Sequence, residues 1–183
     1  IIHSYAPKRA GIEPYDVILI GKSTDASGFG GASFSSQTLD KEDESSNLGA
    51  VQLHDPFMKR VVVEAMKQLF KEIRGNNIEV GYKDLGAGGI ACAASEIAAS
   101  GGFGVDIDLS KVLCGIEGLG PEVISCSETQ ERFCMVVPRG FSQRCCDIFN
   151  KDFDMGRFYP NAGASVVGHV TNNPFFRLFH KGE

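Results

Sequence analysis

The segment from residue 78 to residue 109 constrains the fold of this chain more than any other, because its hydrophobic period changes twice across a glycine turn. "IEVGYKD" (78–84) reads as a strand, and it runs into the glycine turn at 86–89. A helix of very small side chains follows from about Ile90 to Ala99, and a Gly-Gly break separates it from the alternating strand "GVDIDL" (104–109). This order predicts a β-α-β unit whose Ala-rich helix packs close to a sheet.

The remaining patterns predict further strands and helices around this unit. Residues 1–15 contain two prolines and no period, which indicates an extended lead-in, and the apolar run "VILIG" (17–21) is typical of a buried strand. The clearest helix has Asp55 as its cap and Pro56 in its first turn, and it ends near Gly75. Other expected elements are strands at 122–128 and 132–138, a helix over 141–153, and a hairpin of 165–170 with 175–180 about "TNNP". Together they predict a mixed sheet with helices packed on it, and a mobile loop over 35–49.

Length and composition narrow the class of protein. The 183 residues, 43% of them hydrophobic, favour a single domain over 1–183. No apolar run approaches the roughly 20 residues that span a bilayer, and a net charge of -5 without a basic cluster argues against nucleic acid as a partner. The six cysteines form no C-x-x-C pair, which indicates a reducing, cytoplasmic environment. Because the first residue is Ile1 rather than Met, we expect a fragment of a longer chain.

Asp84, at the end of the first strand of the β-α-β unit, is the residue that most favours a binding site. A carboxylate at the C-terminal end of a strand, beside glycines and a helix N-terminus, can reach a hard cation and its phosphates together, which predicts a Mg²⁺ ligand. An aspartate that merely caps the helix or the turn fits the same pattern. Gly86, Gly88 and Ala91 also satisfy G-x-G-x-x-A, the fingerprint of a dinucleotide-binding domain, although a carboxylate beside a pyrophosphate would repel it.

A second candidate is the polar stretch "SETQER" (127–132), which lies between two apolar segments. Turns usually favour Gly, Asn or Asp, so Glu128, Thr129 and Gln130 indicate contacts with a ligand, with a solvated turn as the alternative. Gln52 lies between an apolar pair and the cap of the long helix. A buried amide there must find hydrogen-bond partners, and a ligand is one candidate partner.

Four motifs together resemble one family. They are, in chain order, "STDASGFGGASFSS", "AVQLHDPFMKRVVVEA", "KDLGAGGIACAASEIAASGGFGVDIDL" and "SETQERFCMVV". Over nearly its whole length the chain is similar to the first C-terminal-type domain of formylglycinamidine ribonucleotide synthase II, from the AIR synthetase-related superfamily of purine biosynthesis. The resemblance implies an α+β fold of three layers, α/β/α, with a mixed sheet. It also implies an ATP-dependent carbon–nitrogen ligase that phosphorylates the formylglycinamide oxygen with the help of Mg²⁺ and displaces the phosphate with ammonia from glutamine.

The resemblance also assigns roles to the candidate residues. It implies that Asp84 holds Mg²⁺ and that the substrate contacts are Gln52, Glu128, Thr129 and Gln130, with Thr129 in place of a serine of the family. The catalytic histidines and most ATP contacts would lie in preceding and following domains, so the fragment alone is expected to be inactive. A glutaminase subunit and a small accessory subunit are the implied partners.

The chain departs from the family pattern in one loop. Where the family usually reads T-G-R-D-G, this chain has Thr24-Asp25-Ala26-Ser27-Gly28, so the arginine and the following aspartate are absent. Two other classes of function compete with the synthase: a dinucleotide-binding oxidoreductase domain centred on Gly86 and Gly88, and a non-catalytic assembly module. The assembly module is favoured if Gln52, Asp84 and 128–130 scatter over the surface, and the synthase if they converge.

Overall fold

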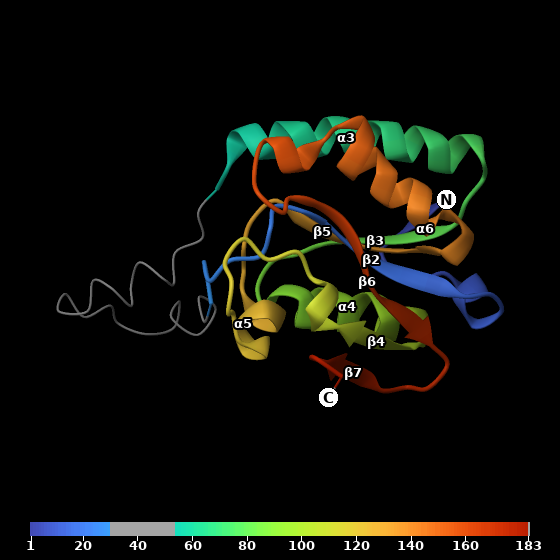
Figure 1. Cartoon of the computed structure of the whole chain (residues 1–183). Coiled ribbons are helices and arrows are strands. Elements are labelled where there is room, and N and C mark those ends of the chain that lie inside the picture. The colour runs from blue at the N-terminus through green and yellow to red at the C-terminus, as the bar shows by residue number, and fades with distance from the viewer. Residues whose placement is uncertain (30–53, 183) are drawn as a thin grey trace.

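The computed structural model describes residues 1–29 and 54–182, and within them the chain forms one mixed sheet with helices on both faces (Figure 1). The order of strands across the sheet is β1-β3-β5-β2-β6-β4-β7. The strands are β1 (Ile2–His3), β2 (Tyr15–Gly21), β3 (Val80–Asp84), β4 (Gly104–Asp108), β5 (Arg132–Pro138), β6 (Gly163–Thr171) and β7 (Phe176–Phe179). The helices are α3 (Pro56–Gly75), α4 (Gly89–Gly101), α5 (Pro121–Cys126) and α6 (Arg139–Asp147), with short turns η1 (Lys8–Gly11), η2 (Leu109–Lys111), η3 (Ile148–Asp152) and η4 (Met155–Arg157).

Two interleaved crossovers build the centre of the sheet. The chain passes from β2 through α3 to β3, and these two strands are parallel because each is antiparallel to β5 between them. It later passes from β5 through α6 to β6, and these strands lie on either side of β2, both antiparallel to it. Helices α3 and α6 therefore cover one face, while α4 and α5 lie on the other (Figure 1). This is the three-layer arrangement with a mixed sheet that the sequence predicts.

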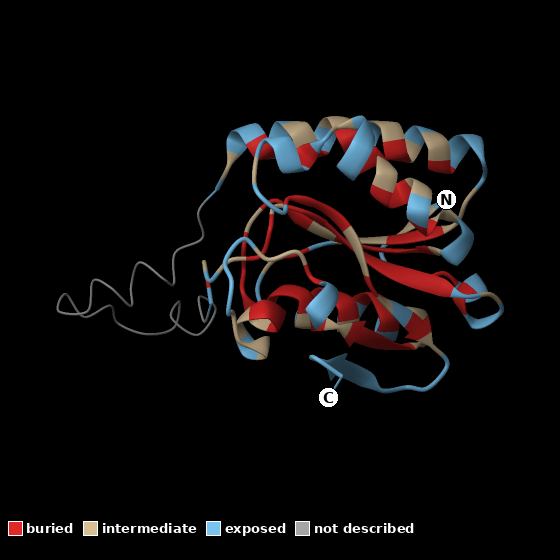
Figure 2. Cartoon of the chain, in the orientation of Figure 1, coloured by how far each residue is buried: buried red, intermediate tan, exposed pale blue. Residues whose placement is uncertain are grey.

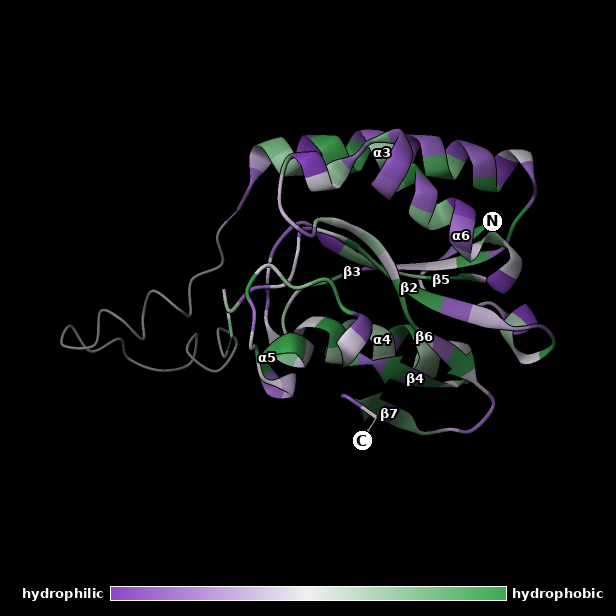
Figure 3. Ribbon diagram, in the orientation of Figure 1, coloured by the Kyte–Doolittle hydropathy of each residue, from purple (hydrophilic) through white to green (hydrophobic). Residues whose placement is uncertain are grey.

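Each face of the sheet carries its own hydrophobic core. Along β2, Ile18 and Ile20 join the cluster under α3 and α6, whereas Val17 and Leu19 join the cluster against α4. Successive side chains of a strand point to opposite faces, so a strand buried on both sides reads as a continuous apolar run. Figure 2 shows the central strands coloured largely red, as buried residues. Figure 3 shows that α4 is largely hydrophobic, whereas α3 and α6 carry hydrophilic residues on the outside.

The elements with strong local signals form as predicted. Helix α3 begins after Asp55, whose side chain accepts a 2.9 Å hydrogen bond from the backbone N–H of Met58, and Pro56 is in its first turn. Helix α4 buries Ala93, Ala94 and Ala98 against the sheet, in agreement with the close packing expected of small side chains. The strands expected at 17–21 and 132–138 are β2 and β5.

Two local predictions are wrong. Residues 122–128 do not form a strand, because α5 occupies 121–126: Pro121 is in the first turn of the helix, and the helix packs on α4. The expected hairpin of 165–170 with 175–180 is also absent. Instead β6 pairs antiparallel with β4 and β7 pairs parallel with the other side of β4.

The two strands of the predicted β-α-β unit are not neighbours in the sheet. Strands β3 and β4 run parallel, but β5, β2 and β6 lie between them. The loop predicted to be mobile, 35–49, lies outside the described residues. None of the described helices is long and apolar enough to cross a bilayer.

Candidate functional site

Three segments meet at one end of the sheet. Strands β2 and β3 are parallel, so the loops that follow them, 22–29 and 85–88, emerge at the same end of the sheet. The antiparallel strand β5 begins at that end. Residues 127–131, which link α5 to β5 and are called the polar turn below, complete the group. The carboxyl ends of strands are where ligands commonly bind in α/β sheets.

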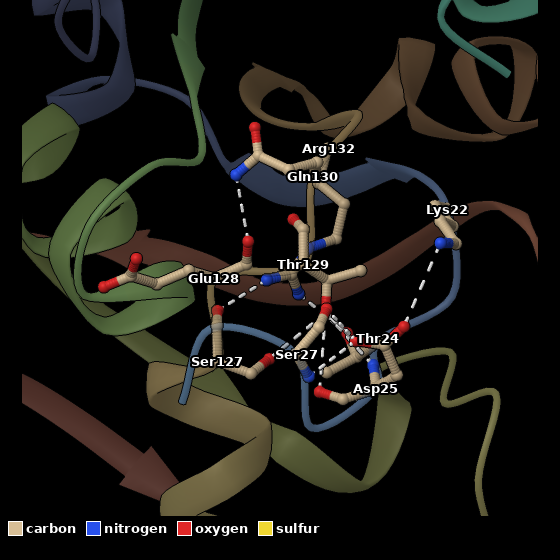
Figure 4. Close-up of polar contacts among 9 residues, drawn as sticks. All are labelled: Lys22, Thr24, Asp25, Ser27, Ser127, Glu128, Thr129, Gln130 and Arg132. Carbon is tan, nitrogen blue, oxygen red and sulfur yellow. Dashed lines mark hydrogen bonds and ion pairs between the residues drawn. The ribbon is translucent and has the colours of Figure 1, made fainter. Parts of the chain in front are cut away.

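Arg132 ties the polar turn to the loop after β2 (Figure 4). Its guanidinium is almost fully buried and donates three hydrogen bonds, to the carbonyl oxygen of Thr129 (2.8 Å), the carbonyl oxygen of Ser127 (2.6 Å) and the hydroxyl of Thr24 (2.8 Å). Burial lowers the pKa of Arg132 to about 10, although the charge of Asp25 opposes the shift. The side chain is therefore still protonated at neutral pH, and its fork fixes the path of the turn.

Asp25 forms the second link between the same two segments. Its Oδ1 accepts a 2.8 Å hydrogen bond from the hydroxyl of Thr129, and the backbone N–H of Asp25 donates back to that hydroxyl at 3.1 Å. Ser27 donates to the same carboxylate from its backbone N–H at 2.9 Å and from its hydroxyl. Burial would raise the pKa of Asp25, but the hydrogen bonds from Ser27 and Thr129 and the charge of Lys22 outweigh it, so the pKa is lowered.

The polar turn also contacts the glycine turn that precedes α4. Glu128 is buried, and its Oε1 accepts a 3.3 Å hydrogen bond from the backbone N–H of Gly88. Gly89 has a φ of +57°, and a Cβ on it would lie 2.4 Å from the carbonyl oxygen of Ser127. Gly89 therefore makes room for the backbone of the polar turn. A Cβ on Gly88 would instead lie 2.9 Å from Cβ of Cys92, and one on Gly86 would meet nothing within 4 Å. Gln130 is half-buried and donates from Nε2 to the carbonyl oxygen of Glu128 at 3.0 Å.

Asp84 lies at the same end of the sheet, on the α3 side. Tyr82 packs edge-on against Phe70 of α3, whereas Lys83 pairs with Glu96 of α4, so alternation directs Asp84 to the face of Tyr82. The side chain of Asp84 is exposed. Gln52 lies outside the described residues. Of the residues that the sequence singled out, the structure thus brings Glu128, Thr129 and Gln130 into one network and places Asp84 at the same end of the sheet.

The described residues do not form a closed metal centre. They contain no group of three or more His, Cys, Asp or Glu side chains that could hold an ion. Mg²⁺ typically binds through one or two carboxylates and completes its shell with water and phosphate oxygens, so the acidic side chains here fit Mg²⁺ only in that open form. A cavity of about 330 Å³ lies apart from the site, between η2 and α5, and no residue of the polar turn lines it.

Sequence reasoning missed three residues of this region. Arg132 and Asp25 hold the network together, and Glu131 has a buried Oε2 without a hydrogen-bond partner among the described residues. One signal was available for Arg132, since a lone arginine that opens an apolar strand must find buried acceptors or point outward. Nothing in the sequence distinguishes Glu131 from a solvated turn residue.

Comparison with known proteins gives a consistent result. Residues 13–181 match the family described as AIR synthase related protein, C-terminal domain. The chain is 48% identical over 183 residues to phosphoribosylformylglycinamidine synthase subunit PurL of Methanothrix thermoacetophila, covering all of this chain and 24% of that protein. Among solved structures, T. maritima PurL complexed with FGAR matches with a TM-score of 0.77 and 28% identity, over 99% of this chain and 27% of that one. T. maritima PurL complexed with ATP matches with a TM-score of 0.73 and 25% identity, over 100% of this chain and 25% of that one. The chain thus spans about a quarter of the length of these relatives.

Proposed function

The chain belongs to the family of AIR synthase related C-terminal domains, and from that premise we propose that it is the substrate- and Mg²⁺-binding domain of a phosphoribosylformylglycinamidine synthase. The observation that carries the proposal is the 48% identity along the whole chain with a subunit of that enzyme. The convergence of the polar turn, the glycine turn and Asp84 at one end of the sheet supports it. The dinucleotide-binding alternative is not supported.

In the proposed reaction, ATP phosphorylates the amide oxygen of formylglycinamide ribonucleotide, and ammonia then displaces phosphate to leave the amidine. Glu128 and Gln130 are the side chains of this chain that would bind and orient the substrate. In the described part of the chain, Gln130 uses one amide N–H on the carbonyl of Glu128, and its carbonyl oxygen and second N–H suit a ligand. The hydroxyl of Thr129 is engaged with Asp25, so Thr129 contributes by holding the turn in place. Mg²⁺, held by Asp84, would neutralise phosphate charge.

The rest of the enzyme would come from outside this chain. Since the chain spans about a quarter of its relatives, the ATP site and the catalytic groups are proposed to lie in preceding and following domains of one polypeptide. A glutaminase subunit and a small accessory subunit would supply ammonia. All six cysteines are free thiols, several of them buried, which is consistent with the proposed cytoplasmic location.

A test of this function is a steady-state assay of the full-length protein with formylglycinamide ribonucleotide, ATP and ammonia. Gln130→Ala should raise the KM for the ribonucleotide roughly 3- to 10-fold, the worth of one neutral hydrogen bond. The matched control is Gln143→Ala, an exposed glutamine on α6 far from the sheet edge, which should leave both constants unchanged. An unaltered KM in Gln130→Ala would remove Gln130 from the substrate site, and absence of amidine formation by the wild type would refute the function itself.

A further inference from the structure

Glu131, the last residue of the polar turn, is held in an unfavourable state that none of the roles above explains. Its side chain is 7% exposed, and its Oε2 is buried without a hydrogen-bond partner among the described residues. Its backbone has a φ of +59°, a conformation that non-glycine residues rarely adopt. Buried carboxylate oxygens are nearly always satisfied, and strained backbone collects at functional sites. A buried, unpartnered acceptor on a strained residue therefore indicates a missing ligand.

The side chain of Glu131 lies on the α3 face of the sheet. Its Oε1 is 4.0 Å from Nζ of Lys59, in the first turns of α3, and that ammonium group lies 5.4 Å from the ring centroid of Phe133. Phe133 in turn stacks on Tyr82. Asp84, directly opposite Phe133 in the register of β3 and β5, is directed to this same face by the alternation of β3. Glu131 and Asp84 therefore both lie next to Phe133, on the face of the sheet that α3 covers.

The strand register places both carboxylates next to one residue, Phe133. Asp84 is directly opposite Phe133 in the antiparallel pair of β3 and β5. Glu131 is two residues before Phe133, immediately before β5 begins. Asp84 makes no hydrogen bond or ion pair with its side chain in the described part of the chain.

Lys59 does not satisfy Glu131. At 4.0 Å it is too far for a hydrogen bond, and because its side chain is 51% exposed, its attraction is screened by solvent. A divalent cation bound directly to the carboxylate would offset the cost of its burial, which an ammonium group 4.0 Å away and half exposed does not. Two protein carboxylates are also the number that Mg²⁺ commonly takes. We propose that Glu131 is a second carboxylate ligand of a divalent-cation site that it shares with Asp84, an inference that rests on the metal role of Asp84 in the proposed function.

The first test measures metal binding directly in the full-length protein, without ATP or substrate. Mn²⁺ is titrated into the millimolar range, and free Mn²⁺ is followed by electron paramagnetic resonance. Glu131→Gln and Asp84→Asn should each lose one Mn²⁺ or bind it at least about tenfold more weakly. Glu117→Gln, an exposed glutamate that loses the same charge, should bind like the wild type. Equal Mn²⁺ binding by the wild type and Glu131→Gln overturns the proposal.

The second test separates a ligand from a structural residue through thermal unfolding of the same proteins. Without metal, Glu131→Gln should be as stable as the wild type or more so, because it removes a carboxylate whose buried Oε2 has no hydrogen-bond partner among the described residues. Added MgCl₂ should raise the Tm of the wild type more than that of Glu131→Gln. A large loss of stability without metal, with an unchanged response to MgCl₂, would make Glu131 a structural residue. Neither measurement depends on catalytic turnover. A wild type that forms no amidine would contradict the proposed function, but the metal-binding result could still be interpreted.

Discussion

Replacement of Arg132 by methionine tests how the candidate site is held together. Methionine has a similar length and no charge, so it can fill the space while it removes all three hydrogen bonds of the guanidinium. Those bonds, of 2.6 to 2.8 Å, connect the polar turn to the loop after β2. The variant therefore breaks the link between the two segments without a large change in side-chain volume.

The expected cost follows from the groups left behind. The carbonyl oxygens of Ser127 and Thr129 would lose a charged donor inside the protein, at about 1–3 kcal/mol for each buried group that stays unsatisfied. Relief of the burial cost of the guanidinium, which is the main cause of its lowered pKa, offsets part of this. We expect a net loss of about 3 kcal/mol, or a fall in Tm of roughly 6–12 °C for a chain of this size. Arg132→Lys keeps the charge and one donor, so it should lose less.

Urea unfolding and thermal melts of the wild type, Arg132→Met and Arg132→Lys measure this loss of stability. The control is Arg60→Met on α3, whose side chain is 73% exposed and pairs with Glu64 four residues on, so it should cost no more than about 0.5 kcal/mol. In the full-length enzyme, Arg132→Lys should recover part of the substrate affinity that Arg132→Met loses. A cost for Arg132→Met no greater than that for Arg60→Met would refute the reasoning, since it would mean that the buried network contributes nothing.

Two further predictions concern the loops that meet the polar turn. Gly89→Ala should destabilise the chain by about 2 kcal/mol or more, because the new Cβ meets a carbonyl oxygen at 2.4 Å and the φ is +57°; Gly86→Ala, with nothing within 4 Å, should cost less, as urea unfolding can measure. Because the folded pKa of Asp25 is lowered, its contribution to stability is present above the unfolded pKa of about 3.9 and is lost as the pH falls through the lower folded value. Thermal melts between pH 6 and 3 should therefore show a steeper loss for the wild type than for Asp25→Asn, and parallel curves would contradict the assignment.

The parts of the fold that depend on local chemistry could be predicted from the sequence. Helix α3 is specified by a cap, a proline in its first turn and apolar residues at helical spacing, all within one segment. Strand β2 is specified by the apolar run at 17–20, because a strand buried on both faces takes apolar side chains at successive positions. In both, the residues that decide the structure are neighbours in sequence.

The wrong predictions concern elements whose structure depends on contacts with segments that are distant in sequence. The β-branched residues of 121–126 suit a strand, yet α5 forms because it packs on α4 at the sheet edge. The polar residues 171–174 suit a hairpin turn, yet they carry the chain across the end of β4, so that β6 and β7 pair with its opposite sides. Strand pairing is a non-local choice that turn residues alone do not determine.

Some residues of the candidate site could likewise be predicted from the sequence, and others could not. Glu128 and Gln130 could be singled out because hydrogen-bonding side chains between two apolar segments are conspicuous in a sequence. The roles of Arg132 and Glu131 depend on burial. The buried guanidinium of Arg132 donates to two carbonyl oxygens of its own turn and to the hydroxyl of Thr24, whereas Glu131 keeps a buried oxygen without a partner among the described residues. Whether a polar side chain is paired is a property of the packed structure.

The contact between Asp25 and Thr129 joins the two places where the chain departs from the pattern it resembles. Asp25 stands in the loop that lacks the arginine and aspartate of T-G-R-D-G, and Thr129 stands where the family has serine. The hydroxyl of Thr129 donates to Asp25 and accepts from its backbone, and Ser27 completes the carboxylate's hydrogen bonds. A carboxylate engaged in this way is an anchor for the loop and is poorly placed to bind phosphate, which it would repel. Under the proposed function, Glu128 and Gln130 would therefore be the residues of the polar turn that contact the substrate, and the loop after β2 would hold the turn in position.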